Sequence, residues 1–368
     1  MSKFSDLQKN CICDADSLRE YLSFPDDEKE VMERIIKRYP LKVPPYYLGL
    51  IDRDDPDDPI KKLCIPDPLE DSDEGEEDTS GEASNTVVKG MQHKYEQTVL
   101  ILSTNNCAGY CRHCFRKRMV GYCGDEVADD LEAMASYVSS HREINNVLIS
   151  GGDAFANENQ VIKDYLETFS ALDNIGLIRF GTRVPVVMPQ RIYEDEELLS
   201  ILEEYGKKVQ IAVVTQFEHP RELTCEAKRA IRALIERGIY VRNQAVLLKG
   251  VNDDPKTLSD LMNGTVAAGA IPYYIFQCRP VLGVKNHFQV PLLTASGIIK
   301  EARALMNGQA RGFRYVLSHP TGKIEVIGPE GDDMIFKYHE AKNPADQGRI
   351  FRVRLDDRKC WLDMSDTK

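Results

Sequence analysis

The stretch VLILSTNNCAGYCRHCFRKR, residues 99–118, places three cysteines directly after a short apolar run. Val99–Ser103 has the composition of a buried strand, and Cys107, Cys111 and Cys114 follow it with the spacing C-x3-C-x2-C. Three thiolates in one loop can surround a single iron–sulfur cluster, because cysteine sulfur is the ligand that such clusters take. The loop offers only three ligands, so one iron would keep an open position for a reactive group.

Two other interpretations of the cysteine loop are a structural zinc site and three packed thiols. A structural zinc ion normally takes four protein ligands, and His113 lies between two of the cysteines, where it cannot easily join them on one metal. We therefore predict that Cys107, Cys111 and Cys114 bind a cluster. His113 is interpreted as a packing or hydrogen-bonding residue beside it.

Short β-branched runs alternate with amphipathic segments after residue 90. The strand-like runs are Val99–Ser103, Asn146–Ser150, Leu177–Gly181, Val209–Thr215, Tyr240–Leu248 and Tyr273–Phe276. Helical patterns lie between them, near Glu126–Ser140, Gln160–Leu172, Glu194–Tyr205, Arg221–Arg237 and Pro255–Ala268. This alternation predicts a parallel sheet with right-handed crossovers, either an open doubly wound sheet or a partial barrel. In both folds the chemistry lies at the carboxyl ends of the strands, where the cysteine loop begins.

The chain divides into four parts by composition. We predict a helical N-terminal region over 1–66, an acidic flexible linker over 67–90, a core over 91–310 and a C-terminal segment over 311–368. Residues 67–86 carry nine carboxylates and no lysine or arginine, which, with their Ser, Gly and Pro content, predicts a solvated segment. Because this segment holds most of the net charge of −12, that charge says little about ligands.

The remaining composition excludes several classes of protein. No apolar stretch approaches the length of a membrane span, and the first residues lack the apolar stretch of a secretory signal. Ten cysteines in such a chain argue for reduced thiols rather than a disulfide scaffold. We predict a cytoplasmic protein with a small-molecule ligand and with no membrane or nucleic-acid partner.

Further motifs accompany the cysteine loop, namely HKY at His93–Tyr95, SGGD at Ser150–Asp153, GTRVPVVMPQRI at Gly181–Ile192 and NQAVLLKGVND at Asn243–Asp253. Together with CRHCFRKRMVG and the upstream PPYYLGLIDRDDPDDPIKK, they make the chain resemble the lysine 2,3-aminomutase family of radical S-adenosylmethionine (SAM) enzymes over essentially its whole length. The resemblance implies an α/β fold, a partial (βα)6-type parallel barrel with a helical N-terminal region and a C-terminal extension.

The resemblance also implies two cofactors on the cysteine loop. In the family a 4Fe-4S cluster binds SAM at its open iron. Once it is reduced by a donor such as flavodoxin or ferredoxin, it yields a 5′-deoxyadenosyl radical that abstracts hydrogen from an amino-acid substrate. The residues expected to contact SAM are Ser150, Gly151, Gly152, Asp153, Arg183 and Gln244. Gly151 and Gly152 suit this role because backbone without a side chain can approach a ligand closely, although GG at a strand end can also be an ordinary turn. The resemblance further implies a homo-oligomer.

The family uses pyridoxal 5′-phosphate as well, held as an imine by a lysine in a glycine-rich loop. The corresponding stretch here is SHPTGKIEV, in which Lys323 follows Gly322, and this loop is shorter and poorer in glycine than the family's. The arginines that meet the phosphate in the family correspond to Lys94 and Thr98, so one cation is kept and one is lost. We expect Lys323 and Lys94 to bind this cofactor; the alternative for Lys323 is a surface or structural lysine.

The expected substrate contacts differ from those of the lysine enzymes. Arg116 matches the arginine that holds the substrate α-carboxylate, and a planar guanidinium suits that role. The two aspartates that hold the distal ammonium of lysine correspond to Arg279 and Ser318. Because a cation cannot replace an anion in binding an ammonium, we expect a glutamate-type substrate with its distal carboxylate on Arg279. The alternative is that Arg279 pairs with a protein carboxylate such as Asp253.

The resulting hypothesis is a radical SAM 2,3-aminomutase that moves an α-amino group to the β-carbon, with Lys323 and Arg116 as catalytic residues. One alternative is a radical SAM enzyme without pyridoxal phosphate that abstracts hydrogen from another amino-acid-like substrate. Another is a non-catalytic iron–sulfur protein. The family's zinc-binding cysteine corresponds to Asp254, so no structural zinc is expected.

Overall fold

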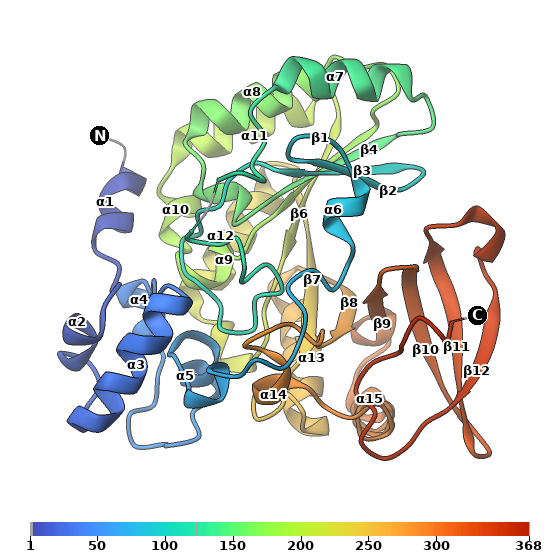
Figure 1. The fold of residues 1–368 in the computed structure, drawn as a ribbon. Helices are drawn as coiled ribbons and strands as arrows, with labels where there is room; N and C mark the ends of the chain where they lie inside the picture. The colour runs from blue at the N-terminus through green and yellow to red at the C-terminus, as the bar shows by residue number, and fades with distance from the viewer. Residues whose placement is uncertain (1–2, 123, 368) are drawn as a thin grey trace.

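A single twelve-stranded sheet, with its strands in sequential order from β1 to β12, forms the framework of the computed structural model (Figure 1), which describes residues 3–122 and 124–367. The parallel part comprises β3 (Thr98–Leu102), β4 (Asn146–Ser150), β5 (Leu177–Gly181), β6 (Gln210–Thr215), β7 (Tyr240–Leu247), β8 (Ile271–Gln277) and β9 (Arg314–His319). A doubly wound sheet reverses its strand order at a switch point, whereas this order runs in one direction. The predicted partial barrel is therefore confirmed, and the doubly wound alternative is wrong.

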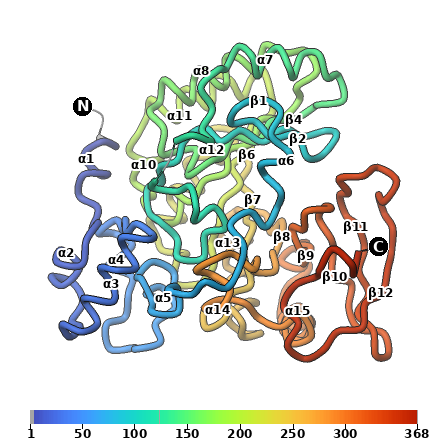
Figure 2. Tube along the Cα trace, viewed as in Figure 1, coloured from blue at the N-terminus to red at the C-terminus, as the bar shows by residue number. Residues whose placement is uncertain are grey.

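The six predicted strands are the strands β3 to β8, with small shifts at their ends. At one edge the sheet continues through the antiparallel strands β2 (Met91–Tyr95) and β1 (Thr86–Val88). At the other edge β9 is followed by the antiparallel strands β10 (Gly322–Glu330), β11 (Asp333–Ala341) and β12 (Ile350–Arg354). These last strands form the red part of the chain in Figure 2, so the C-terminal segment extends the sheet beside the barrel.

Six long helices cover the outer face of the parallel strands. They are α7 (Leu131–Ser140), α8 (Asn159–Ser170), α11 (Glu196–Gly206), α12 (Cys225–Glu236), α13 (Pro255–Ala268) and α15 (Leu292–Leu305). Each buries one apolar stripe, as α12 does with Ala227, Ala230, Ile231 and Leu234. Along β7, buried Val241 and Ala245 alternate with half-buried Arg242 and Gln244, so the strand has a core face and a more open inner face. None of the helices in the described part of the chain is long and apolar enough to cross a membrane.

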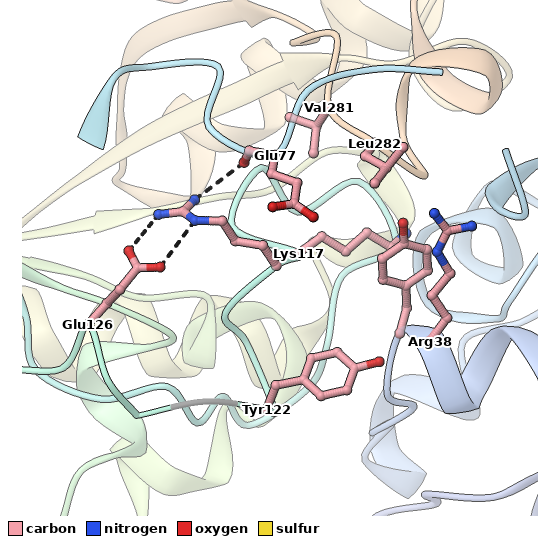
Figure 3. A pocket seen from close by; sticks show the side chains of 9 residues that line it. Arg38, Glu77, Lys117, Tyr122, Glu126, Val281 and Leu282 are labelled. Atoms are coloured by element: carbon pink, nitrogen blue, oxygen red, sulfur yellow. Dashed lines mark hydrogen bonds and ion pairs between the residues drawn. The ribbon is translucent and has the colours of Figure 1, made fainter. Parts of the chain in front are cut away.

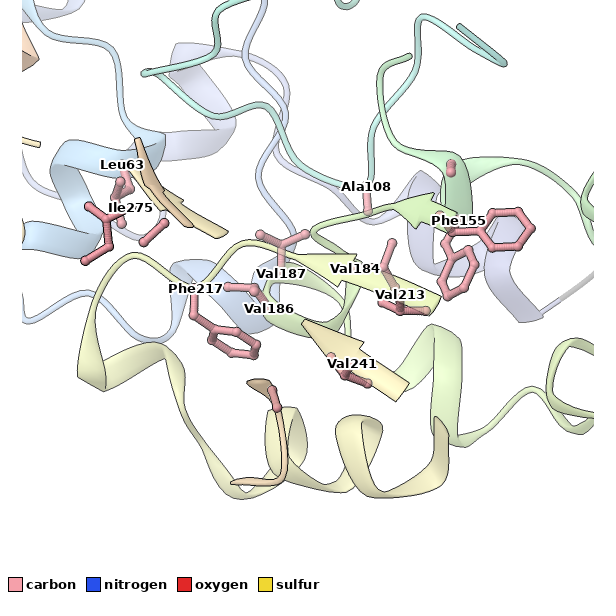
Figure 4. Packing of buried hydrophobic residues seen from close by; sticks show 14 of the residues in the cluster. Leu63, Ala108, Phe155, Val184, Val186, Val187, Val213, Phe217, Val241 and Ile275 are labelled. Atoms are coloured by element: carbon pink, nitrogen blue, oxygen red, sulfur yellow. The ribbon is translucent and has the colours of Figure 1, made fainter. Parts of the chain in front are cut away.

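The main core lies between strands and helices and reaches the cysteine loop. Figure 4 shows Val213 and Val241 of neighbouring strands packed near Val187 of the short helix α9 (Val184–Val187). Ala108, which lies between the first two cluster cysteines, is fully buried in the same core. The loop of residues 104–122, called the cluster loop below, is therefore seated on the barrel core.

The N-terminal region is helical, as predicted, and lies against the cluster loop. Its helices are α1 (Lys3–Lys9), α2 (Ala15–Arg19), α3 (Asp26–Arg38), α4 (Pro45–Leu48) and α5 (Pro59–Cys64). The backbone N–H groups of Tyr110 and Arg112 donate to the carbonyl oxygens of Lys42 (2.8 Å) and Leu63 (2.9 Å). These bonds support the outer side of the cluster loop.

The acidic segment is not the solvated, flexible linker that its composition predicts. Residues 67–86, called the acidic strap below, contain the 3₁₀-helix η1 (Pro68–Glu70) and the helix α6 (Glu82–Asn85). Glu70 is fully buried and accepts hydrogen bonds from Arg112 Nε (2.9 Å) and from Lys117 Nζ. Glu82 is also buried, against Arg116 and Arg118. The prediction was wrong because it weighed the carboxylates without the cations of the cluster loop, which are their partners.

The middle of the strap lies across a pocket of about 480 Å³. Figure 3 shows Glu77 of the strap opposite Lys117 of the cluster loop, with Arg38 and Tyr122 on the far side. Glu76 forms a bridge with Val281, in the segment that follows β8. The strap thus joins the N-terminal helices, the cluster loop and the end of β8.

We expect Glu70→Gln to destabilise the folded protein by about 3–5 kcal/mol, because it leaves two buried cations without their carboxylate. Thermal or urea unfolding measures this loss. Asp73→Asn is the matched control in the same strap, since the Asp73 side chain is 96% exposed although it contacts Arg38; it should change stability by less than about 1 kcal/mol. Equal stability of both variants would contradict the buried placement of Glu70.

Candidate active site at the cluster loop

The three predicted cluster ligands lie together in the cluster loop, after the carboxyl end of β3. Cys107, Cys111 and Cys114 are free thiols of intermediate burial. No three histidine, cysteine, aspartate or glutamate side chains among residues 3–122 and 124–367 converge on a point that a single metal ion would occupy. An iron–sulfur cluster does not need such convergence, because each cysteine binds a different iron. The donor set and its spacing thus fit the cluster.

Apolar groups surround the cysteines. Leu102, Met119 and Val120 form a small buried cluster of their own, and Cys107 and Cys114 pack against it. An apolar shell of this kind limits solvent access to a metal centre and lowers the local dielectric constant.

The SGGD turn presses against the start of the cluster loop. Gly152 N donates to Thr104 O (2.6 Å), and Asp153 N donates to Asn106 O (2.9 Å). Gly151 has φ +120°, and a Cβ atom on Gly152 would lie 2.2 Å from Asn106 O. The glycines therefore allow two backbone segments to approach each other, a structural role closer to the turn that the sequence analysis kept as the alternative to a SAM contact.

Asp153 and Arg183 join the turn to the third parallel strand. Asp153 is buried, and its carboxylate accepts hydrogen bonds from the backbone N–H groups of Phe155 (2.9 Å) and Arg183 (2.7 Å). Arg183 Nη1 donates to Cys111 Sγ (3.2 Å), and Nη2 donates to Tyr47 Oη (3.1 Å) and pairs with Glu222. Arg183, which is predicted to contact SAM, thus donates to Cys111, one of the predicted cluster ligands.

His113, in the cluster loop, packs against Glu218 and Phe288. Its Nε2 is 3.4 Å from Glu218 Oε1, and its ring meets Phe288 edge to face. Burial raises the pKa of Glu218 to about 7 and lowers the pKa of His113 to about 3. Gln244 lies apart from this pair, on the inner face of β7. Glu218, Glu222 and Tyr47 were not identified from the sequence, since buried polar partners carry no spacing signal.

The predicted pyridoxal phosphate and substrate residues meet on the inner side of the barrel. Lys323, on β10, pairs with Glu340 on β11, and its Nζ lies 4.5 Å from the Tyr95 ring centroid. Lys94 Nζ donates to His319 O (2.7 Å). Burial, together with the positive charges of Arg279, Lys323 and Lys342, lowers the pKa of Lys94 to about 7.

Arg279 and Arg116 share one aromatic ring. The Cζ atoms of Arg279 and Arg116 lie 4.2 Å and 4.6 Å from the centroid of the Phe115 ring. Arg279 Nη2 donates to Ser318 Oγ (2.7 Å), whereas Arg279 Nη1 is buried and has no hydrogen-bond partner among the described residues. Burial lowers the pKa of Arg279 to about 10 despite the attraction of Glu82, so the group stays charged at neutral pH. Asp253, the other partner considered for Arg279, instead accepts from Gly250 N (2.8 Å).

The fold and the cysteine loop define a radical SAM enzyme, and the model of the radical SAM superfamily matches residues 101–262. The chain is 36% identical to a candidate L-lysine 2,3-aminomutase of Aquifex aeolicus, over 92% of this chain and 91% of that protein. It is 36% identical to the L-lysine 2,3-aminomutase of Acetoanaerobium sticklandii (82% of this chain, 72% of that protein) and 34% identical to the glutamate 2,3-aminomutase of Clostridioides difficile (85% and 73%). The chain belongs to this family of radical SAM aminomutases and is an isomerase, and the family implies a 4Fe-4S cluster and SAM.

We expect Gly152→Ala to displace the cluster loop, because the new methyl group meets the Asn106 carbonyl and overpacking of this kind costs roughly 1–3 kcal/mol. The measurement is iron and sulfide content after anaerobic reconstitution, which should fall. Gly176→Ala is the control, since a Cβ there has no atom within 4 Å. Full cluster content in Gly152→Ala would show that the turn does not support the loop.

The lowered pKa of Lys94 predicts a pH-dependent effect of Lys94→Met on stability. The unfolded chain holds this proton up to about pH 10.5, whereas the folded protein releases it near pH 7, so the buried ammonium destabilises the wild type most below pH 7. The melting temperature of Lys94→Met relative to wild type should therefore be higher at pH 6 than at pH 9. Lys89→Met, at a half-exposed ion pair with Asp129, should show no such trend. A relative melting temperature that rises between pH 6 and pH 9 would refute the assignment.

Proposed function

We propose that this enzyme is a 2,3-aminomutase for an acidic, glutamate-type amino acid, and that it moves the α-amino group to the β-carbon. Relatives named for lysine and for glutamate match the chain about equally well, so identity does not separate the two substrates. The observation that carries the proposal is the buried, unpartnered Nη1 of Arg279. A buried guanidinium donor needs an acceptor, and a substrate carboxylate supplies one.

The surroundings of Arg279 support an anion more than an ammonium. The positive charge of Arg279 lowers the pKa of Lys94, and the positive charge of Arg116 lowers the pKa of Arg279, so the three cations lie near one another. Ser318 already accepts one hydrogen bond from Arg279. A lysine substrate would bring its ammonium toward this positive region, where like charges repel. A second carboxylate instead adds a charge-assisted hydrogen bond.

The cysteines proposed for the cluster lie in the cluster loop, and the SGGD turn and Arg183, which are proposed for SAM, contact this loop, whereas Gln244 lies on β7. Cys107, Cys111 and Cys114 would hold the cluster, and the SGGD turn, Arg183 and Gln244 would hold SAM. When both are bound, they supply the radical that takes a hydrogen atom from the substrate. The protein places the substrate, excludes water from the radical and, through Arg183, donates a hydrogen bond to Cys111.

Pyridoxal phosphate is proposed as the further cofactor, with Lys323 as the amine and Lys94 near the phosphate. When bound, it supplies the carbonyl group that carries the migrating nitrogen. Lys323 fits in part, because it lies between the rings of Tyr95 and Tyr274 on the inner side of the barrel. Its ion pair with Glu340 must open before the amine can react.

That ion pair also favours a second candidate function, a radical SAM enzyme that works on an amino-acid-like substrate without pyridoxal phosphate. In this case Lys323 and Glu340 are a structural pair that fastens β10 to β11. Reduction with borohydride in the presence of pyridoxal phosphate, followed by peptide mapping, separates the two functions. A label on Lys323 supports the first candidate, and unlabelled protein supports the second.

The direct test is an anaerobic assay of the reconstituted enzyme with glutamate and with lysine, in which β-amino products are detected by mass spectrometry. We expect β-glutamate as the product from glutamate and no β-lysine. Arg279→Gln should lower kcat/KM by about 30-fold or more, because it removes one partner of a buried charge pair. Arg352→Gln, on the exposed strand β12, should leave the rate unchanged. A product from lysine alone would overturn the proposed substrate.

A further inference from the structure

Arg116 uses most of its donors on the protein itself. Arg116 Nε donates to Glu82 Oε1 (2.9 Å), and Arg116 Nη2 forms an ion pair with the same oxygen at 2.8 Å. Arg116 Nη1 donates to Ser150 Oγ (3.3 Å) and to Gly151 O (3.2 Å). The guanidinium is thereby fixed in one orientation, with one edge on the acidic strap and its other amino group on the SGGD turn.

Glu82 is itself firmly held. Its second oxygen accepts a hydrogen bond from Arg118 Nη2 (2.8 Å), and its side chain is 4% exposed. The same Arg118 guanidinium reaches Glu126 and the Glu77 carbonyl, the bridge drawn with dashed lines in Figure 3. Burial opposes the charge of Glu82, but Arg116 and Arg118 outweigh it and lower the pKa of Glu82 to about 2. The carboxylate is therefore charged at neutral pH and well below it.

The backbone around Glu82 is fixed as well. The N–H groups of Glu82 and Ala83 donate to the two carboxylate oxygens of Asp78, at 2.9 Å and 3.1 Å. At the other end of α6, Lys342 Nζ donates to Asn85 Oδ1 (2.6 Å). The strap segment that carries Glu82 is thus held by its own hydrogen bonds and by Lys342, the residue that follows β11.

We propose that Glu82 is a positioning residue that holds Arg116 against the Ser150–Gly151 turn, where SAM binds, and leaves Arg279 as the free anchor for the substrate carboxylate. The part of this inference that concerns the substrate rests on the proposed function. The part that concerns the turn rests only on membership in the radical SAM family.

The distribution of charge explains why this pairing affects binding and not stability alone. Arg116 and Arg279 both lie over Phe115, so without Glu82 both guanidiniums would attract the distal carboxylate of the substrate. Glu82 compensates the charge of Arg116 and occupies its bidentate edge. The unpartnered Nη1 of Arg279 then becomes the stronger attraction for a carboxylate, which sets where the substrate binds.

The strap offers a matched comparison for this role. Glu70 is also buried and also pairs with two cations of the cluster loop, but those cations reach the carbonyls of Pro40 and Gly283 on the outer side of the loop. Among the cluster-loop cations that Glu70 and Glu82 hold in the described part of the chain, only Arg116 donates to the SGGD turn. A purely structural role would therefore give Glu70→Gln and Glu82→Gln the same phenotype.

The experiment compares Glu82→Gln, Glu70→Gln and Glu126→Gln with wild type after anaerobic reconstitution. Equilibrium dialysis gives the dissociation constant of SAM, and EPR of the reduced cluster gives the spectral change on SAM addition. Glu82→Gln should raise this constant about tenfold, because it removes the charge that holds Arg116 against the turn. It should also alter the SAM-induced EPR change and raise KM for the amino acid more than it lowers kcat.

The other two variants serve as controls. Glu126→Gln removes a 43% exposed partner of Arg118 and should match wild type in all of these measurements. Glu70→Gln should melt at a lower temperature yet keep the wild-type SAM constant. If Glu82→Gln does not accumulate as folded protein, Glu82→Asp, which keeps the charge but shortens the reach to Arg116, should raise the SAM constant instead.

Wild-type SAM binding and a wild-type EPR change in Glu82→Gln or in folded Glu82→Asp would overturn the proposal. An equal increase of the SAM constant in Glu70→Gln would also overturn it, because the effect would then be a general loosening of the loop. Failure of the proposed function has a different signature. In that case the wild type makes no β-amino acid from glutamate, while the SAM constants of the variants still decide the role of Glu82.

Discussion

The pairing of the acidic strap with the basic cluster loop is the constraint on which the rest of the site depends. The loop carries four cations within residues 112–118, and three of the four are almost fully buried. Buried cations without partners would cost several kcal/mol each and would force the loop toward water. Glu70 and Glu82 remove this cost from opposite sides of the loop. The cysteines can therefore lie in an apolar shell although charged residues surround them in the sequence.

The sequence predicted the barrel because its signals are local. The apolar runs of β3 to β8 alternate with amphipathic helices, and the cysteine spacing lies directly after the first of these strands. The burial of the acidic strap was not predicted, because it depends on residues that are distant in the sequence. Glu70 and Glu82 are buried because cations 34–47 residues away pair with them, and the composition of the strap alone contains no sign of these partners. A comparison of the strap's charge with that of the cluster loop would have indicated the contact.

For the residues at the inner side of the barrel, too, the sequence predicted the position of each residue but not its partners. Lys94, Lys323 and Arg279 were identified from resemblance, and the structure brings them together. The three side chains differ in protonation and in hydrogen-bond partners, and these differences do not follow from their positions in the motifs. Glu340 holds Lys323, burial among cations favours the neutral amine of Lys94, and Arg279 keeps a free donor. The motif positions therefore predicted which residues lie together. Their protonation and their free hydrogen-bond donors depend on partners from β11 and the strap.

The contact between Arg183 and Cys111 Sγ also bears on electron transfer. A hydrogen bond to a ligand sulfur and a nearby positive charge both stabilise the more negative, reduced form of an iron–sulfur cluster, whereas burial in an apolar shell disfavours it. Arg183 is shared with Glu222, whose negative charge offsets part of this stabilisation. With a cluster on Cys111, the Glu222 carboxylate, acting through Arg183, would therefore help to set the potential at which the cluster accepts an electron.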